Sequence, residues 1–377
     1  MVVSVIFLLK NILLGLIISI ITFILGKKYK FNISTIYLLS LSVFTPIFVI
    51  GFLFDETYMW DTIVYLRNIN FIRDLNSDLI LPDNLDTKIF SWTYSLIPLP
   101  ITDNTTNMGF FSKFLYILFF IYLIKSKILK EKSFLFFLFL LWPSIILYSS
   151  IGLKEIPTLI LCFFVIKSLI DKNYLFMSIS FILLYFLKDQ NSYLLAVVIF
   201  NYIILFEMNF KKLDLLLIFG TLTLLIAFFL LDPIFNKLNF YRFNMFLENL
   251  TPRNEIVLLD YKSPVFIFDV FKFIINFVFS PLPNEINNTL RLVQFLENII
   301  VFSLLLFFMK KAYLIDKKKT IFWVISLLFI FAVYGSITAN SGSIARWRFP
   351  FLVNWILIFN IIIMNKDKIR SESFQKI

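Results

Sequence analysis

Charged side chains that could do chemistry gather in a few short stretches of a strongly apolar chain. A carboxylate can act as a general base, and a lysine or arginine can hold an anionic group such as a phosphate. Each stretch falls where a predicted membrane helix meets water, and such a cluster of costly charges indicates a polar site at the membrane surface. The stretches are Asp55-Glu56 with Asp61 and Arg67, Lys154-Glu155, and Arg346-Trp347-Arg348.

The residue types that the chain lacks exclude several kinds of chemistry. None of the 377 residues is a histidine, the commonest acid and base near neutral pH. Haem, copper and histidine-ligated zinc sites are therefore excluded, as is Ser-His nucleophilic catalysis. The chain has no glycine-rich phosphate loop that ends in Lys-Ser or Lys-Thr. Chemistry must come from carboxylates, lysines, arginines and tyrosines, and we expect no cofactor.

Two acidic residues, Asp55 and Glu56, lie at the outer end of the second predicted span. An acid that is partly desolvated there can serve as a general base or bind a divalent cation, and we do not favour the cation. A solvated helix end that stops the span is an equally weighted interpretation. Asp61 and Arg67 are six residues apart, so they need not pair on one helix face.

Two tight turns on the same predicted side each place a lysine beside an acid. Lys154-Glu155 lies in the turn Ser149-Ser150-Ile151-Gly152-Leu153-Lys154-Glu155-Ile156-Pro157, and Lys188-Asp189 begins a similar turn. Charges that cap a short interfacial turn are the simpler interpretation of either one. Two such turns on one side are more than capping requires, so these four residues are predicted to bind substrate.

Arginines at the last predicted span, Arg346 and Arg348, go against the usual excess of positive charge on the cytoplasmic side. The planar fork of a guanidinium suits a phosphate, so a lipid diphosphate in the membrane plane is a candidate partner. Snorkelling toward lipid headgroups is the alternative.

Three further residues are candidates for contact with substrate. Trp347 and Trp60 could stack on sugar rings or belong to an interfacial aromatic belt. Arg242 is a further predicted substrate contact.

Composition predicts the elements that position these residues. Hydrophobic residues make up 60% of the chain and charged residues 16%, which is too little polar surface for a water-soluble domain. We therefore expect an all-α polytopic membrane protein with about eleven spans, within a range of nine to thirteen. The predicted spans are 6–25, 36–54, 111–124, 134–150, 156–170, 175–187, 193–206, 213–231, 292–309, 321–338 and 349–364.

The distribution of lysine predicts the orientation of these spans. More than half of the 35 lysines and arginines fall in alternate short loops and in the tail 365–377. By the positive-inside rule this alternation places the tail in the cytoplasm and the N-terminus outside. Because the lysines are divided among short loops and form no single basic stripe, we expect no nucleic-acid partner.

Two longer loops, about 55–110 and 232–290, are predicted on the outer side of a single polytopic domain spanning 1–377. In the first, apolar and aromatic residues alternate with charges from Trp60 onward, a pattern typical of an amphipathic interfacial helix. In the second, the apolar stretch 265–279 is short for a span, so we expect an interfacial or re-entrant helix. Each loop contains Pro-Leu-Pro, which is expected to end such a helix.

Together these residues resemble the polytopic enzymes of bacterial surface-polysaccharide clusters: O-antigen and capsule repeat-unit polymerases and the related GT-C glycosyltransferases. The shared features are an acid pair in the first long outer loop, a Ser-x-Gly-x-Lys-Glu turn, Pro-Leu-Pro after a second outer helix, and Arg-x-Arg-x-Pro at the last span. The resemblance covers most of the chain, as architecture plus short motifs. The chain ends shortly after its last span, where GT-C enzymes often add a soluble domain, so the polymerases are favoured.

The resemblance implies a bacterial inner-membrane enzyme that uses an undecaprenyl-diphosphate-linked oligosaccharide at the outer face, without metal. It would bind membrane lipids, and a chain-length regulator is an implied partner. Asp55 or Glu56 would match the catalytic acid, while Arg346 and Arg348 would hold the diphosphate, with Lys154 or Lys188 assisting. The alternatives are a single-sugar transferase with a polyprenyl-phosphate donor and a flippase for lipid-linked oligosaccharides.

Overall fold

The fold is helical throughout the part of the chain that the structure describes. The structure is a computed structural model that describes residues 2–50, 52–54, 60–74, 85–97, 104–207, 235–247, 258–260, 262–338 and 341–374. Within these ranges the chain forms helices and no strand, which confirms the predicted all-α class. The chain divides into two compact units, Met1–Tyr193 and Leu194–Ile377, where the sequence predicted one domain.

Six helices of the described residues are long and apolar enough to cross a membrane. They include Leu9–Lys28, Thr105–Lys125 and Asp189–Phe206, followed by Thr289–Tyr313, Lys317–Ile337 and Gly342–Met364. The structure therefore agrees with a helical membrane protein, and the prediction of eleven spans is confirmed only in part. The predicted span 213–231 lies outside the described residues.

The first unit contains ten complete helices among its described residues and the start of an eleventh. They are α1 (Val2–Lys28), α2 (Ile33–Ser42), α3 (Thr45–Val49), α4 (Trp60–Arg73), α5 (Leu85–Ser95), α6 (Thr105–Lys125), α7 (Phe134–Leu141), α8 (Pro143–Ser150), α9 (Glu155–Ile170), α10 (Tyr174–Leu187) and α11 (Asp189–Phe206), which continues into the second unit.

Two predicted spans of the first unit are broken helices. The span 134–150 is interrupted at Trp142, which is extended with ψ of 118° because Pro143 follows it. A residue before proline is driven out of the α region, and proline then suits the first turn of the next helix. The span 36–54 is also broken, at a turn over Val43 and Phe44, and Pro46 lies in the first turn of α3. Each break leaves two helices too short to span alone.

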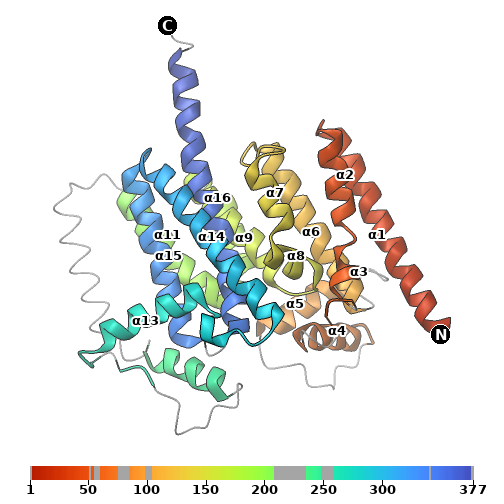
Figure 1. The fold of residues 1–377 in the computed structure, drawn as a ribbon, viewed down its shortest axis with the longest axis horizontal. Helices are drawn as coiled ribbons and strands as arrows, with labels where there is room; N and C mark the ends of the chain where they lie inside the picture. Colours follow the sequence, from red (N-terminus) through yellow and green to blue (C-terminus); the bar gives the residue numbers. More distant parts are fainter. Residues whose placement is uncertain are drawn as a thin grey trace. The chain divides into compact units, whose positions relative to one another are not determined.

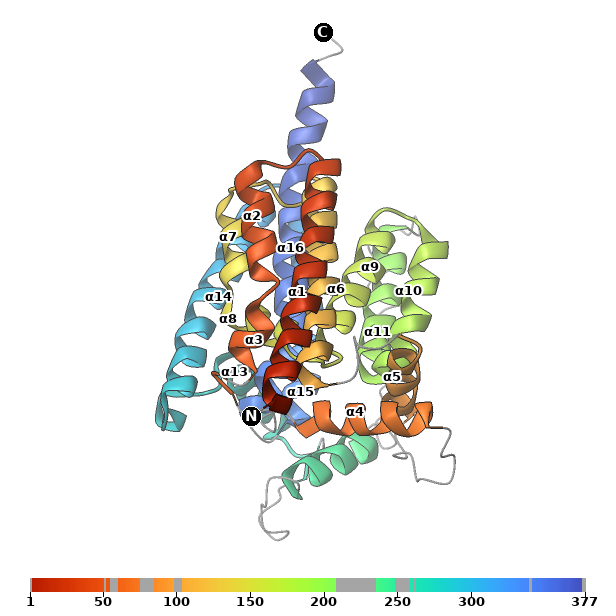
Figure 2. The same cartoon turned by 90° about the vertical axis from the view of Figure 1, so that its right-hand side faces the viewer.

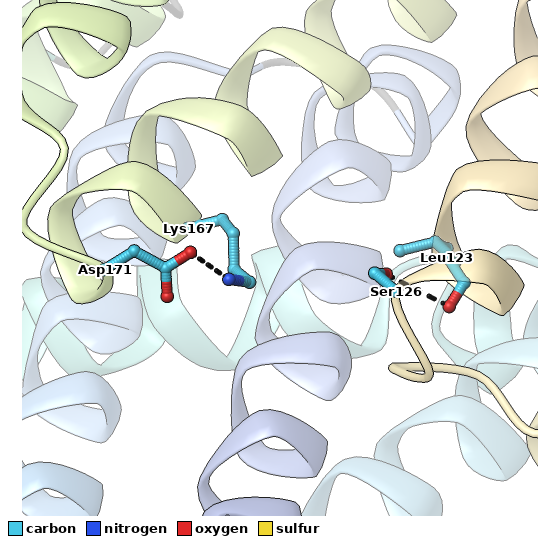
Figure 3. Close-up of polar contacts among 4 residues, drawn as sticks. All are labelled: Leu123, Ser126, Lys167 and Asp171. Atoms are coloured by element: carbon cyan, nitrogen blue, oxygen red, sulfur yellow. Dashed lines mark hydrogen bonds and ion pairs between the residues drawn. The ribbon is translucent and has the colours of Figure 1, made fainter.

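The loops rich in lysine gather at one end of the first unit (Figures 1 and 2). The backbone N–H of Asn32 donates to Glu131 Oε2 at 2.8 Å, and Lys125 lies over the Tyr29 ring, so the loops after α1 and α6 adjoin. At the same end Lys167 pairs with Asp171, as Figure 3 shows beside the turn at Ser126. The predicted clustering of lysines on one side is therefore present within this unit.

The opposite end of the first unit is formed by α4 and α5. Helix α4 runs across the direction of α1 and α6, and α5 packs against α4 and α10 (Figures 1 and 2). Aromatic rings hold α4 against α5: the ring centroids of Tyr65 on α4 and Phe90 on α5 are 4.6 Å apart. Within α5, the ring centroids of Phe90 and Tyr94 are 4.2 Å apart. The amphipathic pattern from Trp60 onward thus correctly predicted a helix here.

The second unit packs around two tryptophans. Its remaining helices are the one over 235–247, α13 (Phe266–Phe279), η2 (Pro283–Glu285), α14 (Thr289–Tyr313), α15 (Lys317–Ile337) and α16 (Ser341–Phe374). Trp355 Nε1 donates to the Trp323 carbonyl at 2.6 Å and both side chains are buried, which fixes α16 against α15. A buried indole N–H needs such a partner.

Helix α13 lies within the stretch 265–279, where the sequence predicted a short helix, and its faces differ in exposure. Phe268, Phe271 and Ile275 expose their side chains along one face, and Phe277 is fully buried against Phe331 and Tyr334. At the close approach to α15, a Cβ on Gly335 would lie 2.5 Å from the Phe273 carbonyl oxygen, so only glycine fits. The helix ends at Phe279, two residues before Pro281, as the Pro-Leu-Pro motif predicted.

Candidate functional site

Two glycines bring the turn between α8 and α9 against the start of α6. A Cβ on Gly109 would lie 2.2 Å from the Ser150 carbonyl oxygen, and one on Gly152 would lie 2.4 Å from the Met108 Cβ. Real Cβ atoms do not approach other atoms so closely, so both positions require glycine. These two close contacts hold the Ser-x-Gly-x-Lys-Glu turn against the apolar helix α6. They therefore also fix the positions of the charged residues in that turn.

Glu155 begins α9 at this turn, with only 1% of its surface exposed. Its Oε1 lies 4.0 Å from Lys188 Nζ, so the two predicted turns meet. Lys154 is also buried, and its Nζ lies 5.5 Å from the centre of the Tyr65 ring on α4. Buried charges are costly unless they are paired, so this ion pair and cation–π contact help to hold the lysines in place.

Lys113 is a member of this site that sequence reasoning missed. It lies inside α6, has 1% of its surface exposed, and its Nζ donates to Ser149 Oγ at 3.3 Å. The neighbouring Ser150 hydroxyl is 2.8 Å from Thr45 Oγ1 on α3. A lone lysine within the predicted apolar span 111–124 was the signal, because an ionisable residue inside a span marks a functional site by default.

We call Lys113, Lys154, Glu155 and Lys188 the charged turn cluster. It joins α6, the α8–α9 turn and the α10–α11 turn at the end of the first unit opposite the lysine-rich loops. Three lysines and one carboxylate give the cluster a net positive charge, which suits an anionic ligand such as a phosphate. Glu155 can also orient a lysine or accept a proton.

Tyr94 lies beside the cluster on α5. Its hydroxyl is buried, and burial together with the negative charge of Glu155 raises the pKa of Tyr94 well above its ordinary value, while the nearby Ser112 hydroxyl lowers it. The phenol therefore stays protonated and can donate a hydrogen bond near Glu155. Sequence reasoning did not single out Tyr94, because tyrosine in an apolar helix gives no distinctive pattern.

The other predicted residues of this unit lie in simpler surroundings. Asp189 begins α11, where a negative charge is favourable at the helix N-terminus, and its Oδ1 accepts from the Gln190 N–H at 2.7 Å. Asp61 lies in the first turn of α4, and the exposed Arg67 packs over the Phe71 ring. Asp55 and Glu56 lie outside the described residues, and their predicted role as a base stays a prediction.

In the second unit Arg348 binds the end of α13. With 3% of its surface exposed, it donates through Nη1 to the Phe277 and Val278 carbonyls and through Nη2 to Ser280 O and Asn298 Oδ1. A helix C-terminus carries partial negative charge and unsatisfied carbonyls, so an arginine there is stabilising. These bonds give Arg348 a structural task, and its predicted contact with a diphosphate stays a prediction.

The remaining residues of the second unit pack close to α13 and α15. Arg242 donates to the Ser336 carbonyl at 2.7 Å and lies over the Phe273 ring, and burial lowers its pKa while Asp269 raises it. The Trp347 ring lies 5.1 Å from that of Tyr334. Arg346 is half-buried one turn into α16. Whether Trp347 also contacts a sugar stays a prediction.

The described residues contain no group of three His, Cys, Asp or Glu side chains that could hold a metal ion. The expectation of chemistry without a cofactor is thereby neither supported nor opposed. Comparison with known proteins found no matching family model, no matching curated protein and no matching solved structure. The assignment of function therefore depends on the chemistry of the site alone.

Proposed function

We propose that the protein is a membrane glycosyltransferase that acts on polyprenyl-diphosphate-linked glycans at the outer face of the bacterial inner membrane and polymerises O-antigen or capsule repeat units. The observation that carries the proposal is the charged turn cluster, in which Lys188 pairs with the buried carboxylate of Glu155, Lys154 is buried in the same turn, and Lys113 is buried on the adjoining helix α6. A cationic site at one end of a bundle of apolar helices suits a substrate whose charge sits on a lipid-linked diphosphate.

The proposed reaction is transfer with inversion at the anomeric carbon. A hydroxyl oxygen of the acceptor sugar attacks that carbon, the bond from the carbon to the diphosphate oxygen breaks, and the hydroxyl proton passes to a carboxylate. Lysines of the charged turn cluster would stabilise the negative charge that develops on the leaving diphosphate. Asp55 or Glu56 is the proposed base.

Surface polysaccharide and its lipid-linked precursors, separated on a gel, test the proposal. We expect a strain without the gene to show chains of one complete repeat unit, and the Lys188→Met, Glu155→Gln and Arg346→Ala variants to approach that pattern at normal membrane abundance. Lys167→Met, which removes the ion pair of Figure 3 at the other end of the unit, is the control and should keep the ladder. An unchanged ladder in the deletion strain would refute the proposal.

The same gel separates the polymerase from the single-sugar transferase. A transferase that adds one sugar from a polyprenyl-phosphate donor would leave an incomplete repeat unit on the lipid when its gene is deleted. Complete single units indicate loss of polymerisation. The two outcomes therefore assign the reaction within the glycosyltransferase class.

Transport of a lipid-linked oligosaccharide is the second candidate, and two observations favour it. The predicted spans that form α2–α3 and α7–α8 are each interrupted, with a proline in the first turn of the second helix, and Lys113 lies buried near the middle of α6. Broken helices and ionisable residues at membrane depth are typical of transporters. Complete, lipid-linked repeat units held on the cytoplasmic side in the deletion strain would support this candidate instead.

A further inference from the structure

A group of buried hydroxyl and amide groups next to the charged turn cluster has no hydrogen-bond partner among the described residues. All are at least nine-tenths buried, and they lie on four helices of the first unit. They are Thr62 and Asn68 on α4, Ser91 and Tyr94 on α5, Ser112 on α6, and Thr158 on α9. Buried polar groups in native proteins are nearly always bonded, so a cluster of exceptions requires an explanation.

Spacing along the helices places these groups on facing surfaces. Thr62, Tyr65 and Asn68 follow at intervals of three on the buried face of α4, and Ser91 and Tyr94 do the same on α5. Tyr94 is also close enough to Ser112 and Glu155 for both to influence its hydroxyl. Thr158 lies three residues after Glu155 on α9 and so shares its face.

Apolar aromatic surface adjoins the hydroxyls. The rings of Tyr65, Phe90 and Tyr94 contact one another in sequence, and Phe111 on α6 meets Tyr94 edge-on at 5.4 Å. Ligand sites usually combine aromatic walls with a few converging polar groups. A sugar presents hydroxyl groups around an apolar ring face, so it matches both kinds of surface.

We infer that Tyr94, Ser112 and Thr158 bind the hydroxyl groups of a sugar unit beside the charged turn cluster. The inference extends the proposed function, because it assigns to this position the sugar carried by the lipid-linked substrate. The Glu155 carboxylate adjoins the same position and can accept a hydrogen bond from a sugar hydroxyl. The substrate class is a neutral or N-acetylated hexose with free hydroxyl groups.

Binding is tested on the purified full chain in a detergent without a sugar headgroup. Saturation-transfer difference NMR with a panel of methyl glycosides of common hexoses and N-acetylhexosamines detects weak sugar binding directly. We expect at least one glycoside to give a signal with the native chain, and the Tyr94→Phe/Ser112→Ala double variant to lose it. Thr158→Val, which keeps the shape of the side chain, should weaken the same signal.

Thermal unfolding separates this role from a structural one. Because the Tyr94 hydroxyl lies near the Ser112 hydroxyl but forms no hydrogen bond of normal geometry with it, Tyr94→Phe should leave the midpoint of thermal unfolding unchanged or raise it. Tyr116→Phe is the matched control: Tyr116 is equally buried in α6, but its hydroxyl donates to the Phe139 carbonyl at 2.7 Å. That control should lower the midpoint and keep the sugar signal.

The outcomes are distinct from those of the polysaccharide test. Absence of any glycoside signal, equal signals in the native chain and the double variant, or a lower midpoint for Tyr94→Phe would each overturn the inference. A sugar signal that depends on Tyr94 in a protein whose deletion leaves the polysaccharide ladder unchanged would reject the polymerase and keep the sugar site.

Discussion

Individual charged residues serve two different purposes in this chain. Glu155 and Lys188 pair at a buried turn beside Lys113, where their net charge suits an anionic ligand. Arg348 instead uses its guanidinium on backbone carbonyls at the end of α13 and on Asn298. The sequence patterns Lys-Glu and Arg-x-Arg do not distinguish these purposes, because the partner groups lie far away in the chain.

The role of Arg348 predicts a loss of stability when it is replaced. Arg348→Met would leave several buried carbonyls unpaired, so we expect the free energy of unfolding to fall by about 2–4 kcal/mol. Arg348→Lys should recover only part of this loss, since an ammonium cannot reproduce the fork. Thermal unfolding in detergent measures both, with Lys272→Met, an exposed cation on α13, as the control. Equal midpoints for Arg348→Met and the control would contradict the prediction.

Whole helices are positioned by close backbone contact as well as by apolar burial. Gly109 allows α6 to meet the α8–α9 turn, and Gly335 allows α15 to meet α13. Several helices also end on lysines with positive φ, where glycine or asparagine is usual: Lys30 after α1, Lys127 after α6 and Lys172 after α9. These elements therefore contain both required glycines and strained lysines.

Substitution of Gly109 should disturb the charged turn cluster through the position of α6. The obstacle to a Cβ at Gly109 is the backbone carbonyl of Ser150, whereas at Gly26 it is a side-chain atom, Cγ1 of Ile36, at the longer distance of 2.7 Å. We expect Gly109→Ala to lower the free energy of unfolding by about 1–3 kcal/mol and to shorten the polysaccharide ladder. Gly26→Ala should have a smaller effect on both the free energy of unfolding and the ladder. Thermal unfolding in detergent compares the two variants, and a lower unfolding midpoint for Gly26→Ala than for Gly109→Ala would refute this account.

The lysines with positive φ predict stabilising substitutions. Lys30 has φ of 57°, and the bonds from its N–H to Lys27 O and from the Phe31 N–H to Gly26 O form the αL end of α1. A residue with a Cβ in this conformation costs about 1 kcal/mol relative to glycine. Lys30→Gly should therefore raise the midpoint of thermal unfolding, and Lys28→Gly, within the helix, should lower it. A lower midpoint for Lys30→Gly would contradict the assigned conformation.

At the scale of the whole molecule, the first unit separates its charges between two ends. The lysine-rich loops lie at one end, and α4, α5 and the charged turn cluster lie at the other (Figures 1 and 2). Such an asymmetry is typical of a multi-pass protein whose positive loops stay in the cytoplasm. Within the second unit, the α14–α15 turn with its lysines and the start of α16 with Arg346 likewise lie at opposite ends of α15.

Cysteine labelling in intact cells tests this orientation. Cys162 is the only cysteine and is fully buried, so a Cys162→Ala chain is a silent background. We expect Arg67→Cys to react with a membrane-impermeant maleimide from outside and Lys127→Cys to react only after the cells are permeabilised, since the two residues lie at opposite ends of the first unit. Labelling of both from the same side would reject the predicted topology.

The sequence by itself determined the all-helical class and the clustering of lysines at one end of the first unit, because composition, apolar runs and lysine spacing are local properties. It also identified Lys154, Glu155 and Lys188 by their position in short turns. Only the tertiary structure decided that these turns meet, that Lys113 and Tyr94 join them, and that Arg348 binds α13. Those contacts link residues far apart in the chain through close helix packing at Gly109 and Gly152, and local patterns do not encode which distant partner a side chain reaches.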